Sequence, residues 1–164
     1  MSDYFKEILN HSKKASSAMS KLSAEDRSRI LMNISGFLLS KKDGILEANR
    51  IDIDRAKSNN ISAPMINRLV LTSEKIDQLS RDVEKIAQME DPLNQTLENW
   101  INPSNGLQFT KVSVAIGVIG IIYESRPNVT IDAACLCLRS GNVSILRGGS
   151  ECIETNKKLY ECIQ

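Results

Sequence analysis

The sequence predicts an α/β protein in which a layer of helices precedes a short β-α-β-α unit. Charged residues and apolar residues at helical spacing fill the chain up to residue 106. Most of the eight glycines lie at Gly106 or later. Two runs of β-branched residues, 117–123 and 143–146, then flank a segment with helical character. The chain therefore divides into a mainly helical segment, 1–106, and a mixed segment, 107–164.

The N-terminal segment carries a clear helix-start signal at Ser23. Ser23 and Asp26 have the spacing of a capping box, and apolar residues then recur at helical intervals. The stripe expected to face the core consists of Ile30, Leu31, Ile34, Phe37 and Leu38. Lys41 and Lys42 suit the negative end of the helix dipole, and Gly44 is expected to end the helix.

Three more helices are predicted before residue 93. One covers 45–57, and a second opens at Ser62-Ala63-Pro64, where proline suits the first helical turn. A third is expected to reach Asp91-Pro92. Its apolar residues follow a 3-4-3 spacing and are Ile76, Leu79, Val83 and Ile86. We interpret this whole segment as a packing scaffold rather than as a carrier of chemistry.

The C-terminal segment predicts extended structure and then two parallel strands. Residues 107–114 have the pattern of a half-buried extended segment. The run 117–123 lacks alternation, which is typical of a parallel strand covered on both faces. A helix over 129–139 leads to a second short strand at 143–146, and Ser150 is expected to cap the last helix. A right-handed crossover brings the loops after both strands to one sheet edge, where α/β proteins bind ligands.

The first of these loops, Glu124–Asn128, offers a carboxylate, a guanidinium and an amide within five residues. Such groups could orient a small acidic substrate or donate a hydrogen bond to a developing oxyanion. The alternative is a turn directed by Pro127, in which the polar side chains only cap the following helix.

The second loop, Arg147–Glu151, places two glycines between an arginine and a helix N-terminus. Backbone N–H groups and the helix dipole favour anions there, and an arginine adds bidentate recognition of phosphate. The loop matches neither the GxGxxG fingerprint nor the GK[ST] phosphate loop. The pattern alone is therefore weak support for a nucleotide phosphate.

Composition excludes several classes of protein. With a formal net charge of +1, the chain lacks the positive excess that favours nucleic acid or anionic membranes. Its most apolar run, 114–123, is too short to span a bilayer, and the N-terminus lacks a secretory signal. Four cysteines without CxxC spacing and a single histidine, His11, favour neither a zinc site nor a disulfide framework. These features predict a reduced, cytoplasmic protein.

The cysteines allow one nucleophile hypothesis. Cys152 falls in the first turn of a predicted helix, where a thiolate is favoured. No histidine follows it, however, and Cys135 and Cys137 are most simply small core residues of an alanine- and leucine-rich helix.

Two strings make the sequence resemble a known family. Residues 117–130 (GVIGIIYESRPNVT) and 145–151 (ILRGGSE) are similar to signature stretches of γ-glutamyl phosphate reductase, or glutamate-5-semialdehyde dehydrogenase. Upstream, Asn49 and Asp52 stand where that family has its "AN..D" pattern, and Arg68-Leu69 precedes a similar helix. The resemblance covers essentially the whole chain.

The resemblance implies a fold and an activity. The family belongs to the aldehyde dehydrogenase superfamily, so 107–164 would be the first β-α-β-α half of a Rossmann-like cofactor domain. The implied reaction is NADPH-dependent reduction of L-glutamyl 5-phosphate to L-glutamate 5-semialdehyde with release of phosphate, the second step of proline biosynthesis. The resemblance also implies a homo-oligomer formed through 107–114 and a functional link to glutamate 5-kinase.

The resemblance further implies roles for single residues. Arg147 matches the basic residue that reaches the adenosine ribose, and an arginine would suit a 2′-phosphate. The first loop would hold substrate, with Glu124 and Arg126 as contacts and Asn128 as oxyanion donor. The cofactor-binding residues are expected to be Arg147, Gly148, Gly149, Ser150 and Glu151.

One departure limits what the resemblance implies. Family members are more than twice as long, and none of the four cysteines matches the motif of their nucleophile. The chain is thus expected to represent an N-terminal portion without the catalytic domain and to be inactive alone. The alternatives are a noncatalytic remnant or interaction module of the same fold, and an unstable truncation.

Overall fold

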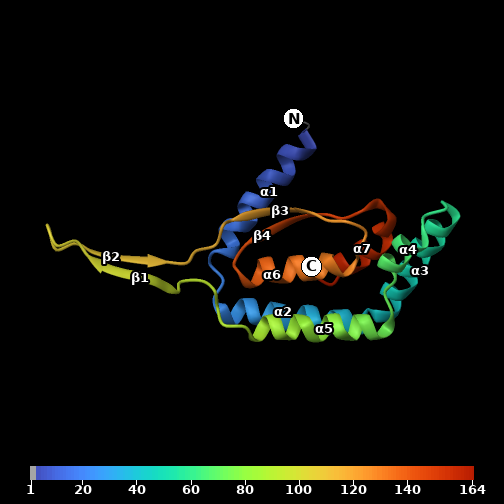
Figure 1. Cartoon of the computed structure of the whole chain (residues 1–164), viewed down its shortest axis with the longest axis horizontal. Helices are drawn as coiled ribbons and strands as arrows, with labels where there is room; N and C mark the ends of the chain where they lie inside the picture. Colours follow the sequence, from blue (N-terminus) through green and yellow to red (C-terminus); the bar gives the residue numbers. More distant parts are fainter. Residues whose placement is uncertain (1–2) are drawn as a thin grey trace.

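The computed structural model describes residues 3–164 as helices packed on a small parallel sheet, with a separate hairpin (Figure 1). The helices are α1 (Asp3–Met19), α2 (Ala24–Ser40), α3 (Lys42–Ser58), α4 (Ala63–Leu69), α5 (Ser73–Gln88), α6 (Asn128–Arg139), η1 (Ser150–Cys152, a 3-10 helix) and α7 (Ile153–Tyr160). The strands are β1 (Thr96–Ile101), β2 (Gln108–Val112), β3 (Val118–Ile122) and β4 (Val143–Arg147). The α/β class and the helical N-terminal layer are confirmed.

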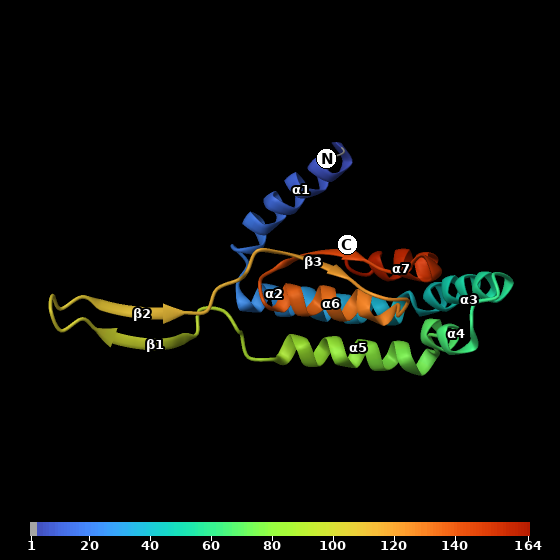
Figure 2. The same cartoon turned by 45° about the horizontal axis from the view of Figure 1, so that its top comes forward.

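Helices α2 and α5 lie side by side and bury the apolar stripes that the sequence predicted (Figure 2). The stripe residues in the core are Leu31, Ile34, Leu38, Ile76, Leu79, Val83 and Ile86. Phe37 is the exception, because 45% of it is exposed and the ammonium of Lys41 lies over its ring. The core continues into α6 through Ile131 and Cys135, which are fully buried.

Helix α6 lies between this pair of helices and the β3–β4 sheet (Figures 1 and 2). The two strands are parallel, with Val118 opposite Val143 and Ile122 opposite Arg147, so the predicted β-α-β-α topology is confirmed. The expectation that the first strand is covered on both faces is wrong. Residues alternate along β3, and Ile122 is 81% exposed, because α6 packs on only one face of this two-stranded sheet.

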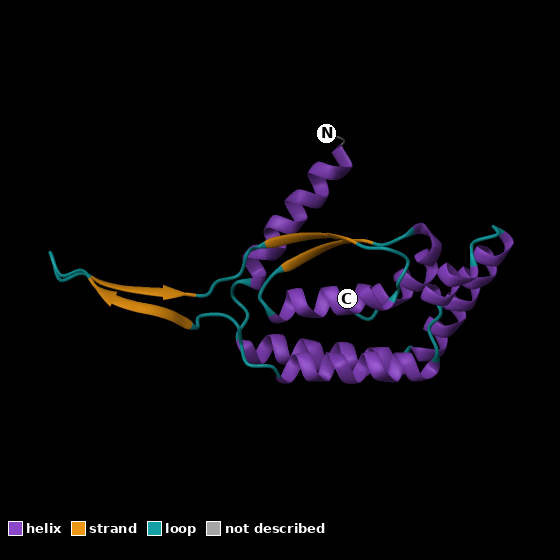
Figure 3. Ribbon diagram, in the orientation of Figure 1, coloured by secondary structure: helices purple, strands orange, loops and turns teal. Residues whose placement is uncertain are grey.

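Strands β1 and β2 form an antiparallel hairpin that projects from the rest of the molecule (Figure 3). The sequence indicated extended structure at 107–114 but not its partner strand β1. The half-buried state expected for 107–114 is also wrong, since every residue of both strands is exposed. Both faces of the hairpin are open because it extends away from the helices. Gly106, where the composition changes, lies in the hairpin turn at φ +71°.

The observed helix boundaries show which of the predicted start and stop signals are correct. Ser23 caps α2 with both hydrogen bonds of the predicted capping box. Gly44 does not end a helix: α2 stops at Ser40, and Gly44 lies in the first turns of α3. Helix α5 ends at Gln88, earlier than predicted, and Asp91 instead accepts two hydrogen bonds from the buried guanidinium of Arg27.

A buried polar cluster fixes α7 against the N-terminal helices. Asn49 of α3 donates to the Leu69 carbonyl and accepts from the Leu71 N–H, both at 2.8 Å. Asp52, one helical turn later, accepts from the backbone N–H of Thr155 at 2.8 Å and from its hydroxyl at 2.7 Å. The "AN..D" pattern thus has a structural meaning, because it places the start of α7.

Candidate functional site

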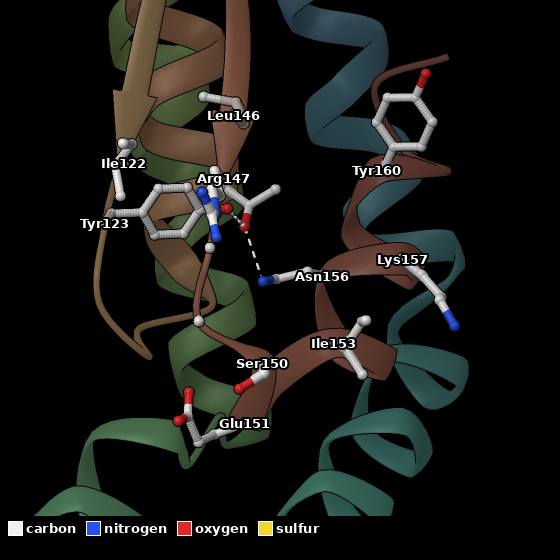
Figure 4. A pocket seen from close by; sticks show the side chains of 13 residues that line it. Ile122, Tyr123, Leu146, Arg147, Ser150, Glu151, Ile153, Asn156, Lys157 and Tyr160 are labelled. Carbon is white, nitrogen blue, oxygen red and sulfur yellow. Dashed lines mark hydrogen bonds between the residues drawn. The ribbon is translucent and has the colours of Figure 1, made fainter. Parts of the chain in front are cut away.

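A cavity of about 760 Å³ opens at the carboxyl edge of the parallel sheet, beside α7 (Figure 4). It takes shape there because Ile122 pairs with Arg147, so the chain leaves both strands at the same level. The lining residues come from the ends of both strands, from the second loop and from α7, with one residue of α6. They are Ile122, Tyr123, Thr130, Leu146, Arg147, Gly148, Gly149, Ser150, Glu151, Ile153, Asn156, Lys157 and Tyr160.

The two glycines of the second loop stand where no side chain fits. A Cβ on Gly148 would lie 2.5 Å from Asn156 Nδ2 and 3.0 Å from the Tyr123 ring. A Cβ on Gly149 would lie 2.5 Å from the Ser125 hydroxyl oxygen. Glycine at these two positions lets the loop backbone pack directly against Tyr123, Ser125 and Asn156.

The cavity lining carries cationic and polar side chains besides its apolar residues. Arg147 and Lys157 are exposed cations in its lining that lie on different sides of Asn156, and Ser150 is an exposed hydroxyl residue (Figure 4). Glu151 is the single acidic residue of the lining. The hydrogen bond from the Ser125 hydroxyl is the main cause that lowers the pKa of this carboxyl. A mostly apolar lining that includes an exposed arginine suits a flat ring system that carries an anionic group.

The N-terminus of α7 differs from the expectation. Ser150 makes no capping hydrogen bond to α7, because it begins the 3-10 helix η1 that precedes α7. The backbone N–H groups of Glu154 and Thr155 donate instead to Asp52, at 3.3 and 2.8 Å. The protein's own buried carboxylate therefore occupies the place that the sequence suggested for a bound anion.

A chain of hydroxyl and amide groups supports the cavity, and sequence reasoning missed it. The Tyr123 hydroxyl bonds the Thr130 hydroxyl at 2.7 Å, and Thr130 donates to Asn156 Oδ1 at 2.9 Å. The Asn156 amide nitrogen contacts Cys152 Sγ at 3.3 Å. Burial raises the pKa of Tyr123, so this hydroxyl keeps its proton. No spacing rule links these residues, because they meet only through the β3–α6–β4–α7 topology.

The predicted residues of the first loop lie outside this cavity and apart from one another. Glu124 pairs with Arg68 of α4 at 2.9 Å, and Arg126 is exposed. Asn128 donates to Asp132 of its own helix at 3.0 Å and lines a second cavity of about 280 Å³ next to α5. The structure brings the five predicted cofactor residues together but spreads the three predicted substrate residues over neighbouring surfaces.

The four cysteines are free and buried. Burial raises the pKa of Cys135 to about 12 and that of Cys152 to about 11. The hypothesis that the helix N-terminus favours a Cys152 thiolate is therefore corrected, because desolvation outweighs the helix. Within residues 3–164, no three His, Cys, Asp or Glu side chains are grouped so as to hold a metal ion. No helix in the same range is long and apolar enough to cross a bilayer.

Solved structures define the class of fold. A benzaldehyde dehydrogenase from Corynebacterium glutamicum superposes on 92% of the chain with a TM-score of 0.65 at 18% identity, and the chain covers 31% of that structure. At this identity the likeness shows the fold alone: helices and sheet are arranged as in aldehyde dehydrogenases.

Relatives with higher sequence identity to the chain include several γ-glutamyl phosphate reductases. A γ-glutamyl phosphate reductase from Thermotoga maritima matches 98% of the chain with a TM-score of 0.93 at 34% identity. Among curated sequences, the γ-glutamyl phosphate reductases of Thermodesulfovibrio yellowstonii and Caldanaerobacter subterraneus are 39% and 46% identical over 96% and 88% of the chain. The resemblance seen in the sequence is thereby confirmed: the chain is a homologue of γ-glutamyl phosphate reductase.

The chain covers only part of the length of these relatives. The chain spans 38% and 34% of the two curated sequences and 39% of the Thermotoga maritima structure. No family model matches the chain.

Proposed function

We propose that this chain contributes the cofactor-binding part of an enzyme that reduces L-glutamyl 5-phosphate to L-glutamate 5-semialdehyde and releases phosphate. This would be the second step of proline biosynthesis, carried out in the cytoplasm. The observation that carries the proposal is the sequence and structural similarity to γ-glutamyl phosphate reductases over nearly the whole chain. A functional link to glutamate 5-kinase follows from the same reaction, because a kinase must supply the acyl phosphate.

We infer that residues 107–164 bind NADPH, which would supply the hydride, and that 1–106 support them. The cavity meets two requirements of such a ligand. Its apolar wall can cover the adenine ring, and the exposed guanidinium of Arg147 can pair with the 2′-phosphate. The backbone of Gly148 and Gly149 can approach the ribose closely because these residues have no side chains, and Ser150 and Glu151 can bond its hydroxyls.

The first loop would hold the acidic substrate in the proposed reaction. Arg126 is exposed and free to pair with a carboxylate or phosphate, while Glu124 keeps Arg68 close to the same loop. Asn128 would donate to the developing oxyanion, which requires its amide to leave Asp132. These three roles rest on the family resemblance and on the place of the loop at the sheet edge.

Titration of the chain with NADPH tests the proposal directly. Arg147→Ala is expected to weaken NADPH binding by about tenfold, since a charge-assisted contact to phosphate is lost. NADH binding should change little, because NADH lacks the 2′-phosphate. Arg81→Ala is the matched control: Arg81 is an exposed arginine of α5 whose guanidinium bonds Gln78. Equal affinity of the wild type and Arg147→Ala for NADPH would contradict the assignment.

A noncatalytic interaction module is the second candidate, and the hairpin favours it. Trp100 and Phe109 stack at 5.1 Å between ring centroids on an arm whose strand residues are all exposed. An exposed apolar arm of this kind is typical of a protein interface. Stable self-association without any NADPH affinity would support this candidate over the reductase.

A further inference from the structure

We propose that Ser125 is a positioning residue that couples the first loop to the second through its hydrogen bond to Glu151. This inference rests on the proposed function, because it concerns how NADPH at Arg147–Glu151 affects an acidic substrate at Glu124–Asn128. The coupling would make binding of each ligand depend on the presence of the other.

The contact is short, partly buried and nonlocal. The Ser125 hydroxyl donates to Glu151 Oε2 at 2.6 Å across 26 positions of sequence. Ser125 is only 8% exposed, whereas Glu124 and Arg126 on either side of it are exposed. The serine side chain thus points into the protein, where it reaches Glu151, while the charged residues on either side point to solvent. A hydrogen bond this short to a carboxylate is of the strong, charge-assisted kind.

The second loop is shaped to admit this contact. A Cβ on Gly149 would lie 2.5 Å from the Ser125 hydroxyl oxygen, 2.6 Å from Glu151 Oε2 and 3.3 Å from the Ser125 backbone nitrogen. A side chain at position 149 would therefore push both partners apart. The absence of one here is an observation independent of the hydrogen bond, and it indicates that close approach of the two loops is built into the site.

The bond joins the loop that lines the large cavity to the loop that is proposed to hold the substrate. Glu151 lines the large cavity with Arg147, while Ser125 precedes Arg126 by one residue. A cavity of about 400 Å³ borders the bond, between Arg68 and Glu151, and gives the loops room to shift. A ligand that moves Glu151 must then either move Ser125 or break the bond. Linkage requires the effect to be reciprocal for binding.

The coupling is measured in the whole reductase to which this chain is proposed to contribute, as a ratio of two KM values. The KM for L-glutamyl 5-phosphate is determined at limiting and at saturating NADPH. We expect it to change by at least about fivefold in the wild type and by less than about twofold in Ser125→Ala, which removes the donor. Ser58→Ala is the matched control, because its hydroxyl bonds only the Asp54 carbonyl within α3. It should keep the wild-type ratio.

Two further variants separate coupling from simple loss of structure. Glu151→Gln keeps an oxygen that accepts from Ser125 and should retain most of the ratio. Glu151→Ala should lose it, and the double variant Ser125→Ala/Glu151→Ala should be no worse than either single one. Additive losses in the double variant would overturn the proposal, as would a wild-type enzyme whose KM is independent of NADPH.

A readout that needs no activity is the titration of Glu151 by NMR in the 164-residue chain. Because Ser125 holds the pKa of this carboxyl below its ordinary value, Ser125→Ala should raise it. An unchanged Glu151 titration overturns the hydrogen bond itself, and a shifted titration with an unchanged KM ratio overturns the coupling. Failure of the chain to bind NADPH overturns the proposed function instead, and the titration still reports on the contact between the loops.

Discussion

At the scale of one residue, Asp52 shows how a single buried carboxylate joins elements that are distant in sequence. Its carboxylate is fully buried and accepts hydrogen bonds from the Glu154 N–H, from Thr155 and from the guanidinium of Arg55, at 2.7 to 3.3 Å. A charge without water around it is stable only when such donors replace the lost solvation. The donors come mainly from α7, so the residue joins α3 to a helix about a hundred positions later in the chain.

Asp52→Ala should therefore lower the free energy of unfolding by roughly 2–4 kcal/mol, since the change removes a helix cap and leaves buried donors without an acceptor. Urea unfolding of the wild type and the variant measures the difference. Asp54→Ala, on the same helix, is the control: Asp54 is exposed, and its loss should cost less than about 0.5 kcal/mol. Equal stability of the Asp52 variant and the wild type would show that the cluster contributes nothing.

The buried thiol of Cys135 gives the protein a pH dependence on the alkaline side. Burial raises its pKa to about 12, whereas in the unfolded chain a thiol has a pKa of about 8.5. The stability that this group contributes is thus present below the unfolded pKa and is lost as pH rises through the folded one. Between about pH 9 and 10.5, unfolding free energy should fall more steeply in the wild type than in Cys135→Ala, by up to about 1 kcal/mol per pH unit. Parallel slopes would contradict this.

At the scale of the helix, two glycines predict opposite results for the same substitution. Gly36 lies in the middle of α2, exposed and with no atom within 4 Å of the place that a methyl group would take, so Gly36→Ala should stabilise by about 0.5–1 kcal/mol. Gly141 follows α6 at φ +70°, and its Cβ would lie 2.6 Å from Leu93 Cδ1. Gly141→Ala should destabilise by more than about 1 kcal/mol. Thermal or urea unfolding of both variants tests the pair, and a shift of the same sign in both would refute the explanation.

Periodicity predicted the elements that bury one face. The stripes of α2 and α5 and the parallel strands could be found from the sequence, because burial imposes spacing on a helix and β-branched residues on a strand. The hairpin strand β1 could not, since Thr96–Ile101 buries neither face and so carries no alternation. The prediction from Gly44 was wrong for a local reason: α2 and α3 are separated only by Lys41, whose backbone has a negative φ (−99°) and so requires no glycine.

The candidate site, too, contains one part that the sequence predicts and another that it does not. The second loop is contiguous in sequence, so Arg147–Glu151 could be recognised as one group from the order of its residues. Ser125–Glu151 and Thr130–Asn156 could not, because each pair spans 26 positions and meets only after the strands pair. Local patterns predict which loops carry a site, and topology decides which side chains meet there.

At the scale of the whole molecule, the hairpin is the part with the least packing against the rest of the protein. Its strand residues are exposed on both faces, and an isolated two-stranded hairpin is marginal in water. We expect a partner surface to cover it and propose a second copy of this chain, through 107–114. On dilution in gel filtration the apparent mass should fall, and Phe109→Ser should shift the equilibrium towards the monomer. Tyr4→Ser, which removes an exposed aromatic residue of α1, should not. A concentration-independent monomer would exclude the arm as an interface.

The bond between Asp52 and Thr155 also sets an order of events in folding. It joins residues 103 positions apart, and the second loop lies immediately before the helix that it anchors. Such distant pairing forms late, after local helices are already in place. During synthesis, α3 leaves the ribosome long before α7, so water must solvate the Asp52 carboxylate until α7 docks. The ligand cavity thus forms only when α7 docks, and any change that slows docking of α7 leaves a helical protein without a site.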